Sequence, residues 1–153
     1  DFVELPDGNL LVASDSPDLS TVEDYVVEID RETGAVVWEL DMKDLISQED
    51  GQSASMDSDG SEEADWFHNN GLAYDAENDL VLLSARHKDA IVAVNKEDKS
   101  LAWILGDPTG WDGVDPSYFL LRKEKISNGS MHSIMFPFWI MEILLFLTMV
   151  LPR

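Results

Sequence analysis

Apolar and polar residues alternate in short blocks along most of the chain. Up to residue 105, runs rich in Val, Leu and Ile are separated by segments rich in Asp, Asn, Gly and Pro. Short apolar runs between turn-forming residues are typical of β-strands joined by hairpins. The predicted strands are residues 2–5, 9–13, 25–29, 35–40, 68–74, 80–84, 90–94 and 101–105. A helical turn is predicted over residues 42–47, and the pattern as a whole predicts an all-β fold.

The chain also contains an internal repeat. Residues 26–40 (VVEIDRETGAVVWEL) are echoed by residues 91–105 (IVAVNKEDKSLAWIL), and another predicted hairpin precedes each copy. Repeated four-stranded antiparallel units are typical of β-propeller blades, because one such sheet cannot bury both of its faces alone. A β-sandwich would explain single hairpins equally well, but it explains the repeat and its recurring Trp less well. We therefore predict a partial β-propeller.

Charge and composition narrow the function. The chain has 153 residues, and 31 acidic against 10 basic residues give it a net charge of -21. Such a chain repels phosphate backbones and anionic lipid surfaces, which argues against nucleic-acid and membrane partners. The absence of cysteine excludes disulfides, thiolate metal ligands and a cysteine nucleophile.

The most acidic segment does not match a known metal loop. Residues 57–63 (DSDGSEE) offer several carboxylates, but no register gives the calcium-loop pattern with Glu at its twelfth position. We interpret residues 48–65 as a solvated insertion between blades, and we predict no metal and no cofactor.

The candidate chemistry lies around the few histidines. His68 and His87 flank a predicted strand pair that also carries Asn70 and Arg86, and His132 follows a Gly/Ser turn. Two imidazoles and a fixed guanidinium are suited to moving an anionic sulfuryl or phosphoryl group. Taken singly, these residues have simpler roles in packing, surface charge or a loop. His87 would point away from Arg86 if both lay on the strand, so we assign it a structural role.

Several segments together resemble the bacterial arylsulfate sulfotransferase family. They are residues 1–15, 25–45, 65–70 (DWFHNN), 84–87 (SARH) and 103–111 (WILGDPTGW), and the resemblance extends over residues 1–136. It implies a six-bladed β-propeller, of which this chain would supply about half, exported to the periplasm or beyond. It also implies sulfuryl transfer from a phenolic sulfate ester to a phenol, by a ping-pong cycle through a sulfated histidine. Phosphoadenosine-phosphosulfate would not be needed.

The resemblance carries roles onto four residues. His132, within SMHS, matches the nucleophile, although Met131 stands where the family has Gln. His68 and Asn70 match the sulfuryl-contacting His-x-Asn motif, and Arg86 matches the active-site arginine. In this interpretation Arg86 binds two sulfuryl oxygens, Asn70 adds a neutral donor, and His68 exchanges a proton with the phenol.

The last residues depart from the family. Residues 134–151 are almost wholly apolar, which suggests a membrane anchor. However, one allowed codon set for residues 138–151, read from its third base, encodes LDNGDIAFLDNGF, which resembles a hairpin of the family. We therefore expect residues 137–153 to result from a frameshift near Pro137, which the nucleotide sequence can decide.

The start of the chain also suggests a piece of a longer protein, because a predicted strand begins at once without methionine or signal sequence. With open blade edges, such a piece is expected to be poorly stable, to self-associate and to have little or no transferase activity. Two other hypotheses remain open: a non-catalytic propeller that binds proteins, and a membrane-anchored interaction protein.

Overall fold

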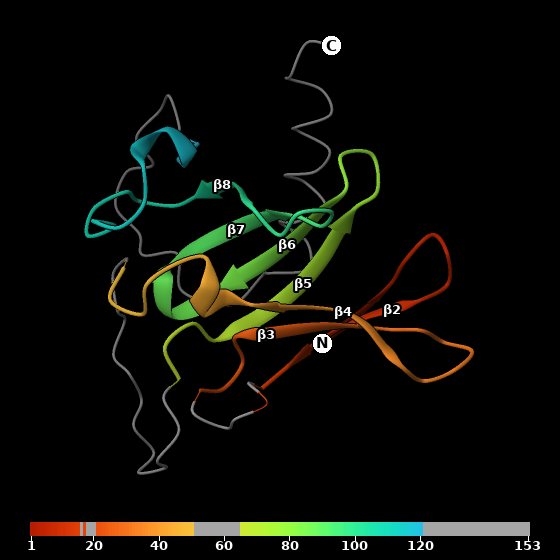
Figure 1. The fold of residues 1–153 in the computed structure, drawn as a ribbon. Helices are drawn as coiled ribbons and strands as arrows, with labels where there is room; N and C mark the ends of the chain where they lie inside the picture. The colour runs from red at the N-terminus through yellow and green to blue at the C-terminus, as the bar shows by residue number, and fades with distance from the viewer. Residues whose placement is uncertain (16, 18–20, 51–64, 121–153) are drawn as a thin grey trace. The chain divides into compact units, whose positions relative to one another are not determined.

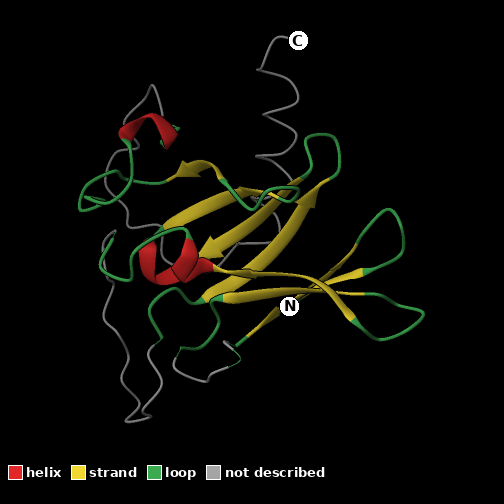
Figure 2. Ribbon diagram, in the orientation of Figure 1, coloured by secondary structure: helices red, strands yellow, loops and turns green. Residues whose placement is uncertain are grey.

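The computed structural model describes residues 1–15, 17, 21–50 and 65–120. Its strands form two four-stranded antiparallel sheets (Figures 1 and 2). The first sheet contains β1 (Phe2–Glu4), β2 (Leu10–Ser14), β3 (Tyr25–Ile29) and β4 (Val36–Asp41), and the second contains β5 (Asn69–Asp75), β6 (Leu80–Ala85), β7 (Ala90–Asn95) and β8 (Leu101–Leu105). In each sheet the strands are neighbours in chain order. The predicted all-β fold of four-stranded blades is confirmed.

The sequence repeat corresponds to a repeat of detailed backbone geometry. The two copies form β3–β4 and β7–β8, and each pair contains one β-bulge. The bulge lies beside Trp38 in the first sheet, where Trp38 pairs with Glu28, and beside Trp103 in the second, where Trp103 pairs with Ala93. The recurring Trp therefore marks the same position in both blades.

Within the described residues, three short 3₁₀ turns lie outside the sheets: η1 (Met42–Asp44), η2 (Arg86–Lys88) and η3 (Pro116–Tyr118). η1 confirms the helical turn predicted after β4, and the Asp41 carboxylate caps it by accepting a hydrogen bond from the Lys43 N–H at 2.9 Å. None of these turns in the described part of the chain is long and apolar enough to cross a membrane.

Two strand limits in the second sheet differ from the prediction by one residue. β5 begins at Asn69, so His68 precedes the strand. β6 ends at Ala85, so Arg86 and His87 lie in η2 and do not alternate across a strand. η2 connects β6 to β7, and Asp89, in the left-handed conformation with φ of 49°, closes this 3₁₀ turn.

One hydrophobic core contains side chains from both sheets, among them Leu11 and Val26 of the first and Leu83 and Val92 of the second. β6 is buried along its whole length. A strand that is buried on both faces reads as a continuous apolar run, as the sequence of β6 (LVLLSA) nearly does.

Hydrogen bonds also join the two sheets. The indole N–H of Trp66, just before β5, donates to the carboxylate of Asp24 at 2.6 Å, and both side chains are buried. At another point of contact, the indole of Trp38 donates to the carbonyl of Lys96 at 2.9 Å. Polar groups buried at such contacts contribute specificity, since each must find its partner to avoid a desolvation cost.

The acidic insertion, except its terminal residues, and the apolar tail lie outside the described residues. The insertion, calcium, anchor and frameshift readings of these segments stay predictions.

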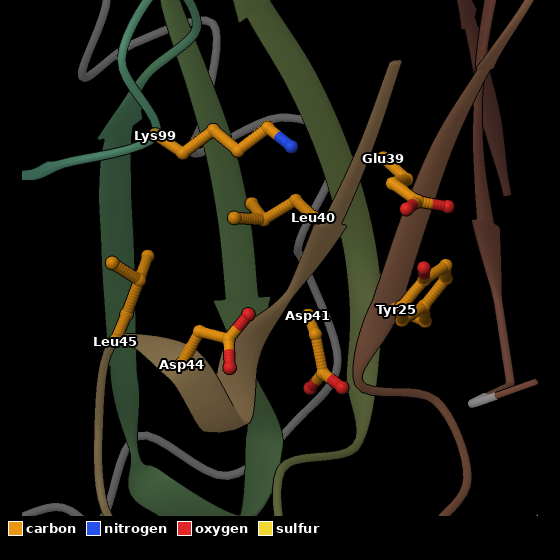
Figure 3. Close-up of a pocket in the computed structure, with 7 residues that line it drawn as sticks. All are labelled: Tyr25, Glu39, Leu40, Asp41, Asp44, Leu45 and Lys99. Atoms are coloured by element: carbon orange, nitrogen blue, oxygen red, sulfur yellow. The ribbon is translucent and has the colours of Figure 1, made fainter. Parts of the chain in front are cut away.

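Tyr25 is held protonated at the end of the first sheet. A hollow of about 110 Å³ there is lined by Tyr25, Glu39, Asp41, Asp44 and Lys99, together with two leucines (Figure 3). Burial, followed by a hydrogen bond to Glu39 and the charges of nearby carboxylates, raises the pKa of Tyr25 to about 12.

This shift predicts a loss of stability in alkali. The pKa of Tyr25 rises from 10.0 in the unfolded chain to about 12 in the fold, so its stabilising effect is complete below pH 10 and is lost as pH rises towards 12. Urea unfolding across this range should therefore show a smaller loss of free energy for Tyr25→Phe than for the wild type. Parallel curves for the two proteins would contradict the assignment.

The Trp66–Asp24 hydrogen bond predicts a second stability effect. Trp66→Phe keeps an aromatic ring but leaves the Asp24 carboxylate without the indole N–H, so it should lower the free energy of unfolding by about 1–3 kcal/mol. A double-mutant cycle with Asp24→Asn isolates the pair. If the two effects were strictly additive, the hydrogen bond would not stabilise the contact between the two sheets.

Candidate functional site

His68 lies at the turn into β5 in an unusual backbone conformation. Its φ is 52°, in the left-handed region that non-glycine residues adopt rarely. Hydrogen bonds on both sides hold it there: the Arg86 N–H donates to the His68 carbonyl at 3.1 Å, and the following Asn69 N–H donates to the Glu23 carbonyl at 2.8 Å. Rare conformations persist where the surrounding contacts determine them, and they are common at functional sites.

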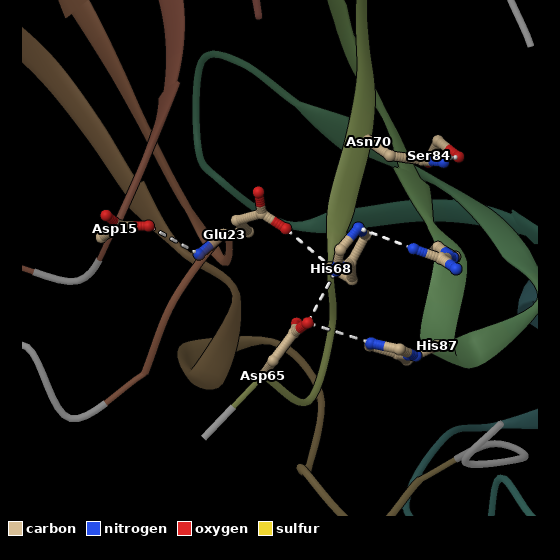
Figure 4. Close-up of polar contacts among 8 residues, drawn as sticks. Asp15, Glu23, Asp65, His68, Asn70, Ser84 and His87 are labelled. Atoms are coloured by element: carbon tan, nitrogen blue, oxygen red, sulfur yellow. Dashed lines mark hydrogen bonds and ion pairs between the residues drawn. The ribbon is translucent and has the colours of Figure 1, made fainter. Parts of the chain in front are cut away.

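Two carboxylates and two imidazoles meet around this residue (Figure 4). Asp65 Oδ2 lies 2.6 Å from His68 Nδ1 and 3.0 Å from His87 Nε2, and Glu23 Oε2 lies 3.0 Å from His68 Nδ1. The two rings meet edge to face, with their centroids 4.9 Å apart. Together with Arg86, these four residues are called the imidazole cluster below.

Arg86 completes the cluster on the other side of the His68 ring. Its Nη1 lies 3.3 Å from His68 Nε2, and its side chain is exposed. The guanidinium therefore keeps most of its donors available to a ligand, and its charge is fixed across the physiological pH range.

Lys88 anchors the turn that carries Arg86. Its Nζ donates to the Gln48 carbonyl at 2.6 Å and lies 5.2 Å from the centroid of the Trp66 ring. Burial lowers the pKa of this ammonium, and the negative charge of Asp50 offsets part of the effect. Through these two contacts, Lys88 connects η2 to the segment after β4 and to Trp66, the residue that hydrogen-bonds to Asp24 between the two sheets.

Asn70 lies two residues beyond His68, at the start of β5. The hydroxyl of Ser84, on β6, donates to Asn70 Oδ1 at 2.7 Å. This bond occupies the amide oxygen, so the exposed Asn70 has its NH₂ group left as a donor for a ligand.

The structure thus brings together two of the predicted site residues, His68 and Arg86. Asn70, near the start of β5, instead contacts Ser84 on the neighbouring strand β6. His132 lies outside the described residues, so its role stays a prediction.

Sequence reasoning missed the rest of the cluster. Asp65 stands three residues before His68, within the segment that carries the resemblance, and this spacing was the available signal. Glu23 gave no signal, because it is far away in the sequence, in the segment that precedes β3 of the first sheet. His87 was expected to point away from the site, but η2 turns its buried ring onto Asp65.

The cluster also has the composition of a metal site, since ligand atoms of Asp65, His68 and His87 all lie within 4.8 Å of one another. Ligands of tetrahedral zinc at about 2.0 Å lie roughly 3.3 Å apart, however. The 2.6 Å between Asp65 Oδ2 and His68 Nδ1 is the distance of a direct hydrogen bond, and a guanidinium beside the ring disfavours a dication. Hydrogen bonding therefore accounts for the cluster.

Comparison with known proteins relates the chain to one family. The family model described as arylsulfotransferase (ASST) matches residues 1–137. The chain is 27% identical over 164 aligned residues to the arylsulfate sulfotransferase AssT of Escherichia coli O6:H1 (strain CFT073), covering 83% of this chain and 27% of that protein. It is 28% identical to the AssT of Lelliottia amnigena, over 60% of this chain and 20% of that protein.

The chain therefore spans about a quarter of the length of these curated relatives. The family match covers the whole region of the sequence resemblance, residues 1–136, and it includes every residue of the imidazole cluster. The protein belongs to the arylsulfotransferase family.

Proposed function

We propose that the protein carrying this chain transfers a sulfuryl group from a phenolic sulfate ester to a phenol. The observation that carries the proposal is the contact between Arg86 and His68, at 3.3 Å, in a chain of this family. It places a fixed cation and an imidazole nitrogen together at an exposed position, as an anionic group in transfer requires.

The donors near Arg86 suit a sulfuryl group. The guanidinium binds two of its oxygens at once, and the outward amide of Asn70 supplies a neutral donor. Charge accumulates on these oxygens and on the leaving phenol as the sulfur–oxygen bond breaks, so fixed donors stabilise the transition state more than the ground state.

The proposed cycle has two half-reactions. An imidazole nitrogen of His132 attacks sulfur, the bond between sulfur and the phenolic oxygen breaks, and the leaving phenoxide takes a proton that His68 Nε2 has first bound from solvent. The acceptor phenol then attacks the sulfated His132, the sulfur–nitrogen bond breaks, and His68 takes back the proton. The role of His132 in this ping-pong scheme, and the independence from phosphoadenosine-phosphosulfate, rest on the family resemblance.

The same proposal extends to the location of the protein, its self-association and the activity of these residues alone. The family resemblance supports a periplasmic or otherwise exported location. Phe2, Val36 and Val37, exposed at 67%, 55% and 55%, leave apolar surface on the first sheet and support self-association. We also propose that these 153 residues alone turn over little substrate, because a site at the mouth of a propeller draws on several blades.

Replacing the guanidinium tests the proposal. In the complete gene product that contains this sequence, Arg86→Ala should lower kcat/KM for p-nitrophenyl sulfate with a phenol acceptor by about 10²–10³-fold, because a transition-state donor is lost. Arg86→Lys should recover only part of this loss, since an ammonium cannot bind two oxygens in the same way.

Arg31→Ala is the matched control, because Arg31 is an exposed arginine paired with Glu4 at 2.9 Å. It should leave kcat/KM unchanged. Wild-type activity in Arg86→Ala would remove the guanidinium from the mechanism.

Trapping the intermediate separates an enzyme from a binding module. Incubating the complete gene product with p-nitrophenyl sulfate alone should attach an acid-labile sulfate to His132, detected by mass spectrometry of peptides prepared at neutral or alkaline pH. His132→Asn should carry none. A protein with neither this label nor turnover would be a non-catalytic propeller.

A further inference from the structure

We propose that Asp65 is a positioning residue of this site, which holds His68 in the tautomer protonated at Nδ1 and so keeps Nε2 turned towards Arg86. His87 in turn holds Asp65. The role in catalysis rests on the proposed sulfuryl transfer, whereas the tautomer follows from the hydrogen bonds of the described residues alone.

The tautomer follows from the donors around the His68 ring. A guanidinium carries only hydrogen-bond donors, so Arg86, 3.3 Å from Nε2, requires a lone pair on that nitrogen. The proton of the neutral ring must then be on Nδ1. That nitrogen faces two acceptors, Asp65 Oδ2 at 2.6 Å and Glu23 Oε2 at 3.0 Å. All three contacts are satisfied by one protonation pattern.

Of the two carboxylates, Asp65 is the better placed to fix the ring. It makes the shorter hydrogen bond, and its side chain is 21% exposed against 46% for Glu23. Solvent screens the more exposed Glu23 and leaves its side chain freer to move. A short hydrogen bond to a less exposed carboxylate orients an imidazole more firmly.

His87 fixes Asp65 from the other side. Its ring is almost fully buried, and its Nε2 lies 3.0 Å from the same Oδ2 atom. Because a carboxylate only accepts, His87 donates from Nε2. The other oxygen, Asp65 Oδ1, is buried and has no partner among the residues that the structure describes, so the two imidazoles alone set the orientation of this carboxylate.

The arrangement prepares Nε2 for proton exchange. When His68 takes a proton at Nε2, the ring becomes a cation beside Arg86, and the charges of Asp65 and Glu23 offset this repulsion. Without Asp65, the ring is free to adopt the opposite tautomer, whose Nε2–H would face the donors of Arg86. Carboxylates play such a part for the histidine of a Ser-His-Asp triad, where the amide variant lowers kcat by about 10⁴-fold.

The tautomer is measured directly by ¹⁵N NMR of the His68 ring in the complete gene product, with the signals assigned by their loss in His68→Gln. EDTA in the sample excludes bound metal. The wild type should show His68 protonated at Nδ1 with a bare Nε2, and Asp65→Asn should move the ring towards the opposite tautomer. A wild-type His68 protonated at Nε2 would overturn the proposal without any variant.

Kinetics of the complete gene product test the catalytic part. Asp65→Asn should lower kcat by about 10²–10⁴-fold for donors with poor leaving groups and change KM much less, because proton exchange is impaired and not binding. Asp65→Glu should restore part of the loss, Glu23→Gln should cost less than Asp65→Asn, and the exposed Glu4→Gln serves as a neutral control.

An unchanged kcat in Asp65→Asn would refute the positioning role. Absence of turnover in the wild type would instead refute sulfuryl transfer, and the NMR result would still decide the state of the His68 ring.

Discussion

The joint between the two sheets is the constraint on which the site depends. Glu23 and Asp24 lead into β3 of the first sheet, while Trp66 precedes β5 of the second and Asn69 begins it. The indole of Trp66 binds the Asp24 carboxylate at 2.6 Å, and the Asn69 N–H binds the Glu23 carbonyl at 2.8 Å. These two bonds fix the backbone on both sides of His68 and bring the Glu23 side chain, from the other sheet, onto its ring. Residues 66–69 therefore both join the two sheets and carry the candidate site.

Much of the fold could be predicted from periodicity and turn residues. β3 and β8 have the predicted limits, and the recurring Trp identified equivalent strands in the two blades. The errors fell at strand ends, as at the start of β5 and the end of β6, which each differ from the prediction by one residue. The 3₁₀ turn after β6 and the left-handed Asp89 that closes it are local geometry, which gives no periodic signal.

The candidate site was only partly predictable for a related reason. Resemblance found His68, Asn70 and Arg86, since each stands in a recognisable motif. The residues that orient them were not found as such. Glu23 reaches the site through the joint between sheets, and His87 reaches it through η2, so both depend on tertiary contacts that a linear pattern does not contain.

The site also lies in a chain with a net charge of -21, which repels an anionic substrate at long range. Under the proposed function, recognition of a sulfate ester therefore relies on short-range donors such as Arg86.

The most direct measurement is a crystal structure of the complete gene product with an aryl sulfate bound. The account predicts sulfuryl oxygens on the Arg86 guanidinium and the Asn70 amide, His68 Nε2 near the phenolic oxygen, and a ring nitrogen of His132 in line behind sulfur. A sulfate ester bound elsewhere, or the rings of His68 and His132 on opposite sides of the molecule, would contradict it.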